Sequence, residues 1–230
     1  FKYMKKIFVS ITFFYLTVAF PSFSHVEHYK EFNVLNYELF RNDKSIGYHK
    51  YNFERKDSSL KVKSVVEFKI TKLGVDLYKY YAESDENYKN NTFFSFNSKT
   101  NQNNKEKYVK IKKTSDDNLI IDGTSFKGET SNKNIVGTWW NHEIIQADAQ
   151  ISAISGRIIE QKVTFLGKKE IELYGKKYKA LHFNFSSSDE SLPENKKLNT
   201  DIWYEEDTYL WLKASFKKSG NWEYRLKNYK

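Results

Sequence analysis

The run Trp139-Trp140-Asn141-His142-Glu143 holds the densest group of side chains that could recognise a ligand. An indole can stack on a sugar ring or an acyl chain, and the amide and imidazole that follow can hydrogen-bond a ligand. In the alternative interpretation, which we favour, Trp140 is a core residue and Asn141 caps backbone groups. Trp139, Trp140, Asn141 and His142 are therefore candidate ligand-binding residues that also have a purely structural explanation.

A second aromatic group consists of Tyr78, Tyr80 and Tyr81, followed by Glu83. In a strand, Tyr78 and Tyr80 share one face, whereas Tyr81 and Glu83 share the other. Such a ladder could bind carbohydrate or a lipid head group, although it more often packs across strands. Tyr78 and Tyr80 are the candidates for ligand binding in this segment.

The histidines suggest one metal hypothesis. If a leader is removed after Ser24, His25 becomes the N-terminal residue, and its amine and imidazole could chelate copper together with His28. An ordinary frayed terminus is the simpler interpretation. The acidic turn 205–207 could hold calcium, but it lacks the glycine of a calcium-binding loop. We therefore expect neither a resident metal nor a cofactor.

The sequence contains no catalytic motif that we can recognise. It has no Gly-x-Ser-x-Gly elbow, phosphate-binding loop, dinucleotide-binding fingerprint or His-Glu-x-x-His pair, and it has no cysteine nucleophile. Carboxylates are plentiful, but nothing in their spacing pairs them for acid–base catalysis. We expect that the protein is not an enzyme.

The elements that must position these side chains are predicted to be strands. Apolar residues alternate with lysine, glutamate and threonine between residues 60 and 71, which is typical of a half-buried antiparallel strand. Tyrosine, phenylalanine and valine are enriched in similar segments. Strands are predicted at 34–40, 46–55, 60–71, 76–88, 92–97, 107–113, 118–122, 157–166, 177–186, 200–205, 209–217 and 222–227.

One segment has a helical period instead. Apolar side chains recur there at i, i+4, i+7 and i+11, in Trp140, Ile144, Ala147 and Ile151. We predict one helix near 139–150, with Thr138 as its N-cap. Short turns separate the strands, and they favour a meander of hairpins. The predicted fold is mostly β: a strongly curved antiparallel sheet or open β-barrel of about eleven to twelve strands with one helix.

The charge balance does not indicate a nucleic-acid-binding protein. The net charge is +9, but almost all of the positive charge is lysine, and nucleic-acid readers favour arginine. Lysine, asparagine, isoleucine, phenylalanine and tyrosine all have A/T-rich codons, so we attribute the basic balance first to genome bias. A weak attraction to anionic lipid head groups or envelope polymers is the functional alternative.

The first 24 residues are typical of a secretory leader. Lysines at positions 2, 5 and 6 precede an apolar run at 7–20, and Pro21 is followed by the small-x-small pattern of Ser22-Phe23-Ser24. The run is shorter than the roughly 17–25 residues of a membrane span. We expect a signal peptide at 1–24, a single β-rich domain at 25–230 and a periplasmic location. Without cysteine, disulfides and bacterial lipid attachment are both excluded.

Several short motifs occur in a fixed order: 37–39, 46–49, 73–80 with Glu83, Trp140-Asn141, 155–157, 163–167, 201–204, 210–211 and 224–226. Together they resemble a group of uncharacterised exported β-proteins of Gram-negative bacteria, known only as domains of unknown function. The group often has proline after the Trp-Asn pair, where this chain has His142. The resemblance implies an envelope location and a strongly curved antiparallel sheet, loosely similar to lipoprotein-carrier-like folds. It implies no activity and no catalytic residue.

Three functions remain open at this point. The leading hypothesis is a periplasmic binding or carrier module for an apolar or amphipathic envelope component, such as a lipid or glycolipid. The alternatives are a small outer-membrane β-barrel and an envelope scaffold that recognises another protein through a sheet edge. A deep apolar pocket would favour the carrier, whereas a filled core would favour the scaffold.

Overall fold

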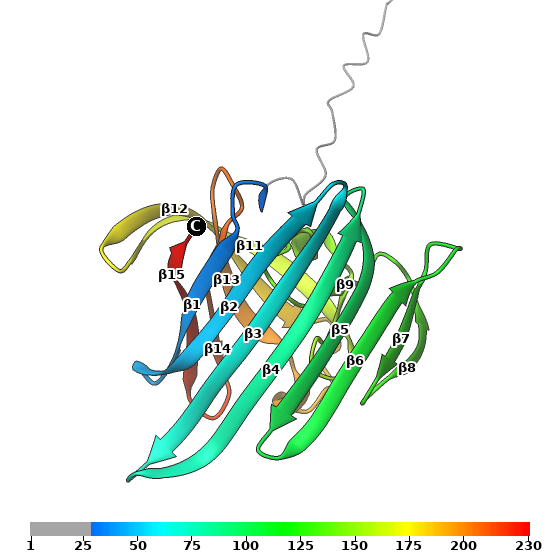
Figure 1. The fold of residues 1–230 in the computed structure, drawn as a ribbon. Helices are drawn as coiled ribbons and strands as arrows, with labels where there is room; N and C mark the ends of the chain where they lie inside the picture. The colour runs from blue at the N-terminus through cyan, green and yellow to red at the C-terminus, as the bar shows by residue number, and fades with distance from the viewer. Residues whose placement is uncertain (1–28) are drawn as a thin grey trace, which may run out of the picture.

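The computed structural model describes residues 29–230, which form one large curved β-sheet (Figure 1). The first eight strands are β1 Val34–Arg41, β2 Lys44–Lys56, β3 Ser59–Lys72, β4 Val75–Lys89, β5 Thr92–Gln102, β6 Lys105–Lys113, β7 Leu119–Gly123 and β8 Lys127–Thr130. The remaining strands are β9 Ile135–Val136, β10 Ala149–Ile151, β11 Ile158–Leu173, β12 Lys176–Ser187, β13 Asn199–Glu205, β14 Trp211–Lys217 and β15 Asn221–Tyr229. Two short 3₁₀ helices are described, η2 His142–Gln146 and η3 Glu194–Lys196. The predicted leader, with His25 and His28, lies outside the described residues.

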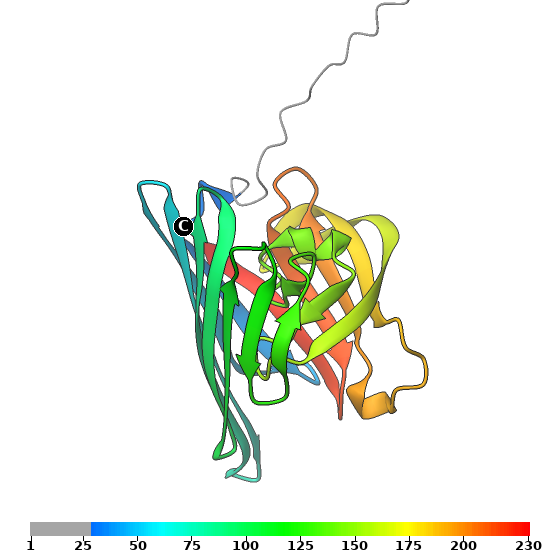
Figure 2. The same cartoon turned by 90° about the vertical axis from the view of Figure 1, so that its right-hand side faces the viewer.

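The strand order is two meanders joined at the ends of the domain. β1 pairs with β2 on one side and with the last strand, β15, on the other, so the sheet runs from β8 through β1 and β15 to β9. Every pairing is antiparallel except that of β9 with β10. The sheet curls until its two ends face each other without pairing (Figure 2). We call the gap between β8 and β9 the seam. The predicted open, curved, mostly β fold is confirmed.

The described residues 29–230 contain fifteen strands rather than eleven or twelve. The additional strands β8, β9 and β10, of four, two and three residues, lie at the seam. Segments this short cannot display the alternation from which strands are predicted. Each of them forms by pairing with a neighbouring strand: β8 pairs with β7, β9 with β10, and β10 with β11.

The helix predicted near 139–150 is mostly absent. Only His142–Gln146 is helical, in a 3₁₀ turn, and Asn141 rather than Thr138 is its N-cap. Trp139 has a positive φ of 53°, which no helix accommodates, and Ala149–Ile151 is strand β10. The four apolar side chains behind the prediction are all buried, but they come from different elements. Ile144 lies in η2 and Ile151 in β10, whereas Trp140 and Ala147 lie in irregular backbone. Four apolar residues at helical spacing are therefore not sufficient evidence for a helix.

Aromatic side chains fill the space that the sheet encloses. The largest cluster gathers inward-facing residues of both meanders, and its bulkiest fully buried members are Trp140, Trp211, Tyr29, Tyr37, Tyr51 and Tyr204. A smaller cluster lies under β5 to β7, and a third lies between β1, β3 and β4. Because protein interiors are close-packed, this part of the molecule has a core rather than a channel.

Buried tyrosine hydroxyls hold the loop that precedes η2. The hydroxyl of Tyr51 donates to the carbonyl oxygen of Thr138 at 2.6 Å, and that of Tyr204 donates to the carbonyl of Trp139 at 2.8 Å. Both bonds satisfy backbone carbonyls that the irregular loop leaves without a ladder partner. The loop that carries the candidate residues 139–142 is therefore hydrogen-bonded to strands β2 and β13 of the sheet.

Within residues 29–230, no helix has the length and the apolar character that crossing a membrane would require.

Candidate functional site

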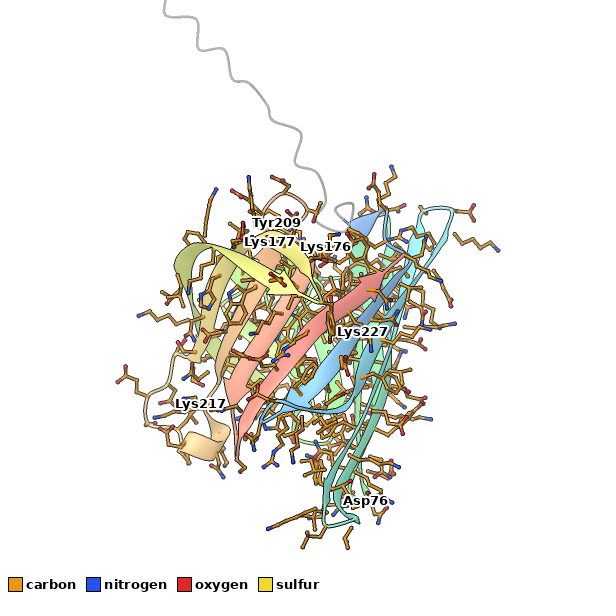
Figure 3. The ribbon with its side chains drawn as sticks, turned by 90° about the vertical axis from the view of Figure 1, so that its left-hand side faces the viewer. Asp76, Lys176, Lys177, Tyr209, Lys217 and Lys227 are labelled. Carbon is orange, nitrogen blue, oxygen red and sulfur yellow. The ribbon has the colours of Figure 1, made fainter. Side chains whose placement is uncertain are left out.

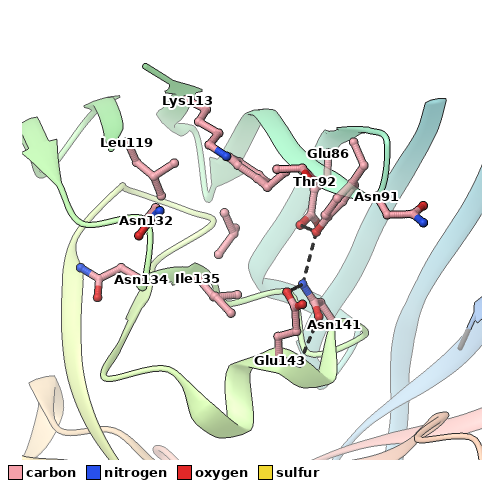
Figure 4. Close-up of a pocket in the computed structure, with 13 residues that line it drawn as sticks. Glu86, Asn91, Thr92, Lys113, Leu119, Asn132, Asn134, Ile135, Asn141 and Glu143 are labelled. Carbon is pink, nitrogen blue, oxygen red and sulfur yellow. Dashed lines mark hydrogen bonds between the residues drawn. The ribbon is translucent and has the colours of Figure 1, made fainter. Parts of the chain in front are cut away.

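A pocket of about 290 Å³ lies at the seam, where the two ends of the sheet face each other (Figure 4). The end of β4 and the start of β5 form one side, and β9 and η2 form the other. The lining residues that carry the argument below are Glu86, Phe93, Leu119, Ile135, Asn141 and Glu143.

Glu86 is the least expected member of this site, because its side chain is only 2% exposed. Its carboxylate accepts three hydrogen bonds: from the Tyr88 hydroxyl at 2.6 Å, from the Trp140 indole nitrogen at 2.9 Å and from the Thr138 hydroxyl at 3.2 Å. A carboxylate buried this deeply needs such donors to persist. Glu86 thereby fastens β4 to the loop before η2.

Two opposing effects act on the pKa of Glu86. Burial raises the pKa, and the hydrogen bonds from Tyr88, Trp140 and Thr138 lower it, but burial is the larger effect. The nearby carboxylate of Glu143 raises it further. The pKa therefore lies above its ordinary value, and the wall of the pocket carries an acid that protonates more readily than a surface glutamate.

Asn141 orients the polar wall of the pocket. Its side-chain oxygen accepts a hydrogen bond from the backbone N–H of Glu143 at 3.0 Å, which caps η2. Its amide nitrogen donates to the Tyr88 hydroxyl and to the Glu143 carboxylate, both at 3.3 Å. The Asn141 amide and the Tyr88 hydroxyl thus link the carboxylates of Glu143 and Glu86. Figure 4 shows Asn141 and Glu143 together below Glu86.

Apolar side chains form the rest of the argument for a binding site, because they line the same pocket as these polar groups. Phe93, Leu119, Ile135 and Val136 line the same pocket. The basic residue of the lining, Lys113, forms an ion pair with Asp117. The lining can therefore contact an apolar group and also accept hydrogen bonds or balance a positive charge.

The structure separates the four candidate residues of the first run. Asn141 lines the pocket, and Trp140 stands behind it as a fully buried donor to Glu86. Trp139 packs instead on Trp211, with ring centres 5.3 Å apart, and His142 stacks on Tyr209 at 4.6 Å. The structural interpretation of Trp140 as core and Asn141 as a cap fits this geometry, and Asn141 also faces the pocket.

Tyr78 and Tyr80 do not join this site. Both rings stack on Phe68, at 6.0 and 4.7 Å, toward the beginning of β4, whereas Glu86 and Tyr88 lie near its end. The cross-strand packing that was the alternative interpretation describes them well.

Sequence reasoning did not find Glu86 or Tyr88 as site residues, and it included Glu143 in the run 139–143 without making it a candidate. A signal for Glu86 existed, because it shares its parity on β4 with the buried residues Tyr80 and Tyr88. A carboxylate on the buried face of a strand needs hydrogen-bond donors nearby. Such a residue therefore indicates a buried polar network.

The described histidines lie apart from one another. His49 is buried in the core and bonds the Ser64 hydroxyl at 2.8 Å, and burial lowers its pKa to about 3. His182 stacks on Trp203 at 4.2 Å. Within residues 29–230, no group of three histidine, aspartate or glutamate side chains is placed to hold a metal ion. The copper hypothesis concerns His25 and His28, which the structure does not describe.

Comparisons with known proteins address the fold. The model of a family described as a domain of unknown function, DUF6134, matches residues 37–227. A crystal structure of a β-barrel-like protein of the domain of unknown function DUF1849, from Brucella abortus, is similar with a TM-score of 0.58. The similarity covers 85% of this chain and 95% of that one at 8% sequence identity, so it concerns the fold alone. No curated protein matches the chain.

Proposed function

The chain belongs to the DUF6134 family, whose function is unknown, and we propose that it is an exported periplasmic protein that binds an amphipathic component of the cell envelope. In this proposal the protein is a binding module and not an enzyme. Its ligand places a polar, hydrogen-bond-donating head group in the seam pocket.

The observation that carries the proposal is the mixed character of the pocket lining. The carboxylates of Glu86 and Glu143 can accept hydrogen bonds or balance a positive charge, and the Asn141 amide adds a neutral polar group beside them. Phe93, Leu119 and Ile135 supply apolar surface in the same lining. Sites that recognise small molecules combine apolar walls with a few convergent polar groups in this way. Hydroxyls of a glycan or an ammonium group would both suit the polar wall.

The size of the pocket limits what it can enclose. Its volume of about 290 Å³ is at the lower end of the roughly 300–1,000 Å³ of small-molecule sites. The neighbouring interior is filled by Trp140, Trp211 and the buried tyrosines. We therefore propose that the head group and the first part of an apolar tail are bound, whereas a carrier that encloses a whole acyl chain would need a larger space.

The location rests on the sequence. The charged, apolar and small-residue parts of the segment 1–24 are those of a secretory leader, and the absence of cysteine suits a chain that folds after export without disulfides.

Native mass spectrometry tests the proposal. The protein would be recovered by osmotic shock from cells that express the full sequence, and any bound compound would be extracted with organic solvent. We expect a reproducible lipid or glycolipid mass on the wild-type protein. Thr92→Trp, an exposed position in the lining, should fill the pocket and remove that mass.

A matched control is Ile120→Trp, because Ile120 lies 51% exposed on the face of β7 opposite to the lining residue Leu119. This variant should retain the ligand. A wild-type protein that carries no compound, or a ligand that Thr92→Trp retains, would refute the proposal and favour a scaffold. Recovery of the protein only in detergent would refute the proposed soluble location.

A further inference from the structure

The hairpin of β3 and β4 projects beyond the rest of the sheet, and its end is apolar. Figures 1 and 3 show the projection, with Asp76 labelled at its end. Residues 71–77 are all exposed. Leu73 is 95% exposed, Val75 is 61% exposed and Leu77 is 54% exposed. We call residues 69–79 the tip.

The backbone of the turn gives no reason for a leucine at position 73. Leu73 and Gly74 have φ values of 51° and 78°, a left-handed conformation that disfavours a side chain like that of leucine. Other tight turns of this protein place Asn42-Asp43, Asn90-Asn91 and Asn103-Asn104 in the same conformation. Asparagine tolerates it well. Leucine at 73 is therefore unfavourable for the turn and almost wholly in contact with solvent.

Tyr174 provides a comparison within the molecule. It also precedes a glycine with a positive φ, and its own φ is 49°. Its hydroxyl, however, donates a hydrogen bond to the Glu38 carboxylate at 2.8 Å. The large residue at that turn contributes a contact to the fold, whereas the exposure of Leu73 leaves it little contact to contribute.

Basic side chains surround the apolar end of the hairpin. Lys69 and Lys79 are opposite each other, and Lys72 is opposite Val75. The acid within the tip, Asp76, lies 3.2 Å from the Lys79 ammonium. The excess of positive charge is complementary to an anionic surface, and Leu73, Val75 and Leu77 all lie nearer to the turn than the pair Lys69 and Lys79.

We propose that the tip docks on an anionic lipid bilayer. Leu73, Val75 and Leu77 would enter the boundary between head groups and acyl chains, while Lys69 and Lys72 contact lipid phosphates. Stable attachment to a membrane surface generally needs two such signals, an apolar anchor and a basic patch. Here one turn supplies both.

The tip and the seam pocket are at opposite ends of one strand. Val75 begins β4 and Glu86 lies near its end, a separation of eleven residues or roughly 35 Å along an extended strand. Docking by the tip would therefore leave the pocket open to the periplasm, and the two proposals can fail independently.

Vesicle flotation tests the docking. The purified protein should float with phosphatidylcholine vesicles that contain phosphatidylglycerol, and less with phosphatidylcholine alone. Leu73→Asn should weaken binding about tenfold, because it removes the most exposed apolar group. The same variant should unfold at an equal or higher temperature, because asparagine suits the turn. Ile120→Thr, which removes an equally apolar exposed residue far from the tip, should bind like the wild type.

A second measurement reports on the tip itself. In Leu73→Trp, the fluorescence of the new indole, taken as the difference from the wild-type protein, should shift to shorter wavelength on vesicles and be quenched by brominated acyl chains. Binding by Leu73→Asn at the wild-type level, or an unshifted emission of Leu73→Trp, would overturn the proposal. Absence of binding to any vesicle would also overturn it and indicate a protein partner for the tip.

Discussion

The indole nitrogen of Trp140 lies 2.9 Å from the carboxylate of Glu86, 54 positions earlier in the chain. This bond joins strand β4, in one meander, to the loop before η2, in the other. The sheet does not close between β8 and β9, so side-chain bonds of this kind connect the two meanders across the interior. Glu86 also lines the seam pocket, which lies beside this connection.

Removal of the Glu86 carboxylate should destabilise the domain. Glu86→Ala removes the buried acceptor of the Trp140 indole and of the Tyr88 hydroxyl, and we expect a loss of about 3 kcal/mol or more in the free energy of unfolding. Glu86→Gln should lose roughly 1–2 kcal/mol, because an amide oxygen can still accept from the indole. Urea denaturation measures both values. Equal stability of the alanine variant and the wild type would contradict this role.

The same residue should give the domain a component of stability that falls as pH rises. Burial raises the pKa of Glu86 above its ordinary value of 4.5, against the hydrogen bonds of Tyr88, Thr138 and Trp140 and with the help of Glu143. The native state therefore holds this proton more tightly than the unfolded chain does. Its contribution is fully present below pH 4.5 and is lost as pH rises through the folded-state pKa, by at most about 1.4 kcal/mol per pH unit. In Glu86→Gln, the dependence of the urea midpoint on pH should lack this component, and an unchanged dependence would show that Glu86 does not titrate in this way.

His49 should produce the opposite dependence in acid. Burial lowers its pKa from 6.5 to about 3, so the unfolded chain binds a proton that the native state excludes. Its contribution is present above pH 6.5 and is lost as pH falls toward 3, on the order of 5 kcal/mol in total. His49→Gln can keep a hydrogen bond to Ser64 without titrating, so its stability should decline less between pH 7 and pH 4. A parallel decline in both proteins would assign acid unfolding to other groups.

The class of fold was predictable because it depends on a repeated pattern. In strands such as β1, buried residues alternate with residues that are only partly buried. Every second position of β1 is a large buried side chain, in Leu35, Tyr37 and Leu39, and this pattern is visible in the sequence. Pairing of β1 with β15 follows from no local pattern, because the two segments are at opposite ends of the domain. The order of the strands therefore required the structure.

The site was only partly predictable, for a related reason. Asn141 was identified because it follows two tryptophans, but its partner Tyr88, and Glu86, the partner of Trp140, come from another hairpin more than fifty residues away. The helix predicted around Asn141 was mostly wrong, since the hydroxyls of Tyr51 and Tyr204, both distant in the sequence, hydrogen-bond the loop in a non-helical conformation. The hydrogen bonds around the pocket join side chains that are far apart in the sequence. No local sequence pattern predicts such pairs.

Gly47 should be essential for the pairing of β2 with β3. A Cβ atom at this position would lie 2.0 Å from the Glu67 carbonyl oxygen and 2.5 Å from the Phe68 Cβ atom, so backbone would have to move. Gly47→Ala should cost about 3 kcal/mol or prevent soluble expression, since a well-packed strand pair cannot adapt to an atom in this place. Gly74→Ala is the matched control, because nothing lies within 4 Å of its Cβ position and only its positive φ opposes alanine, at about 1 kcal/mol. Soluble yield and urea denaturation distinguish the two variants, and a Gly47→Ala protein as stable as Gly74→Ala would show that β2 and β3 are not in close contact at this point.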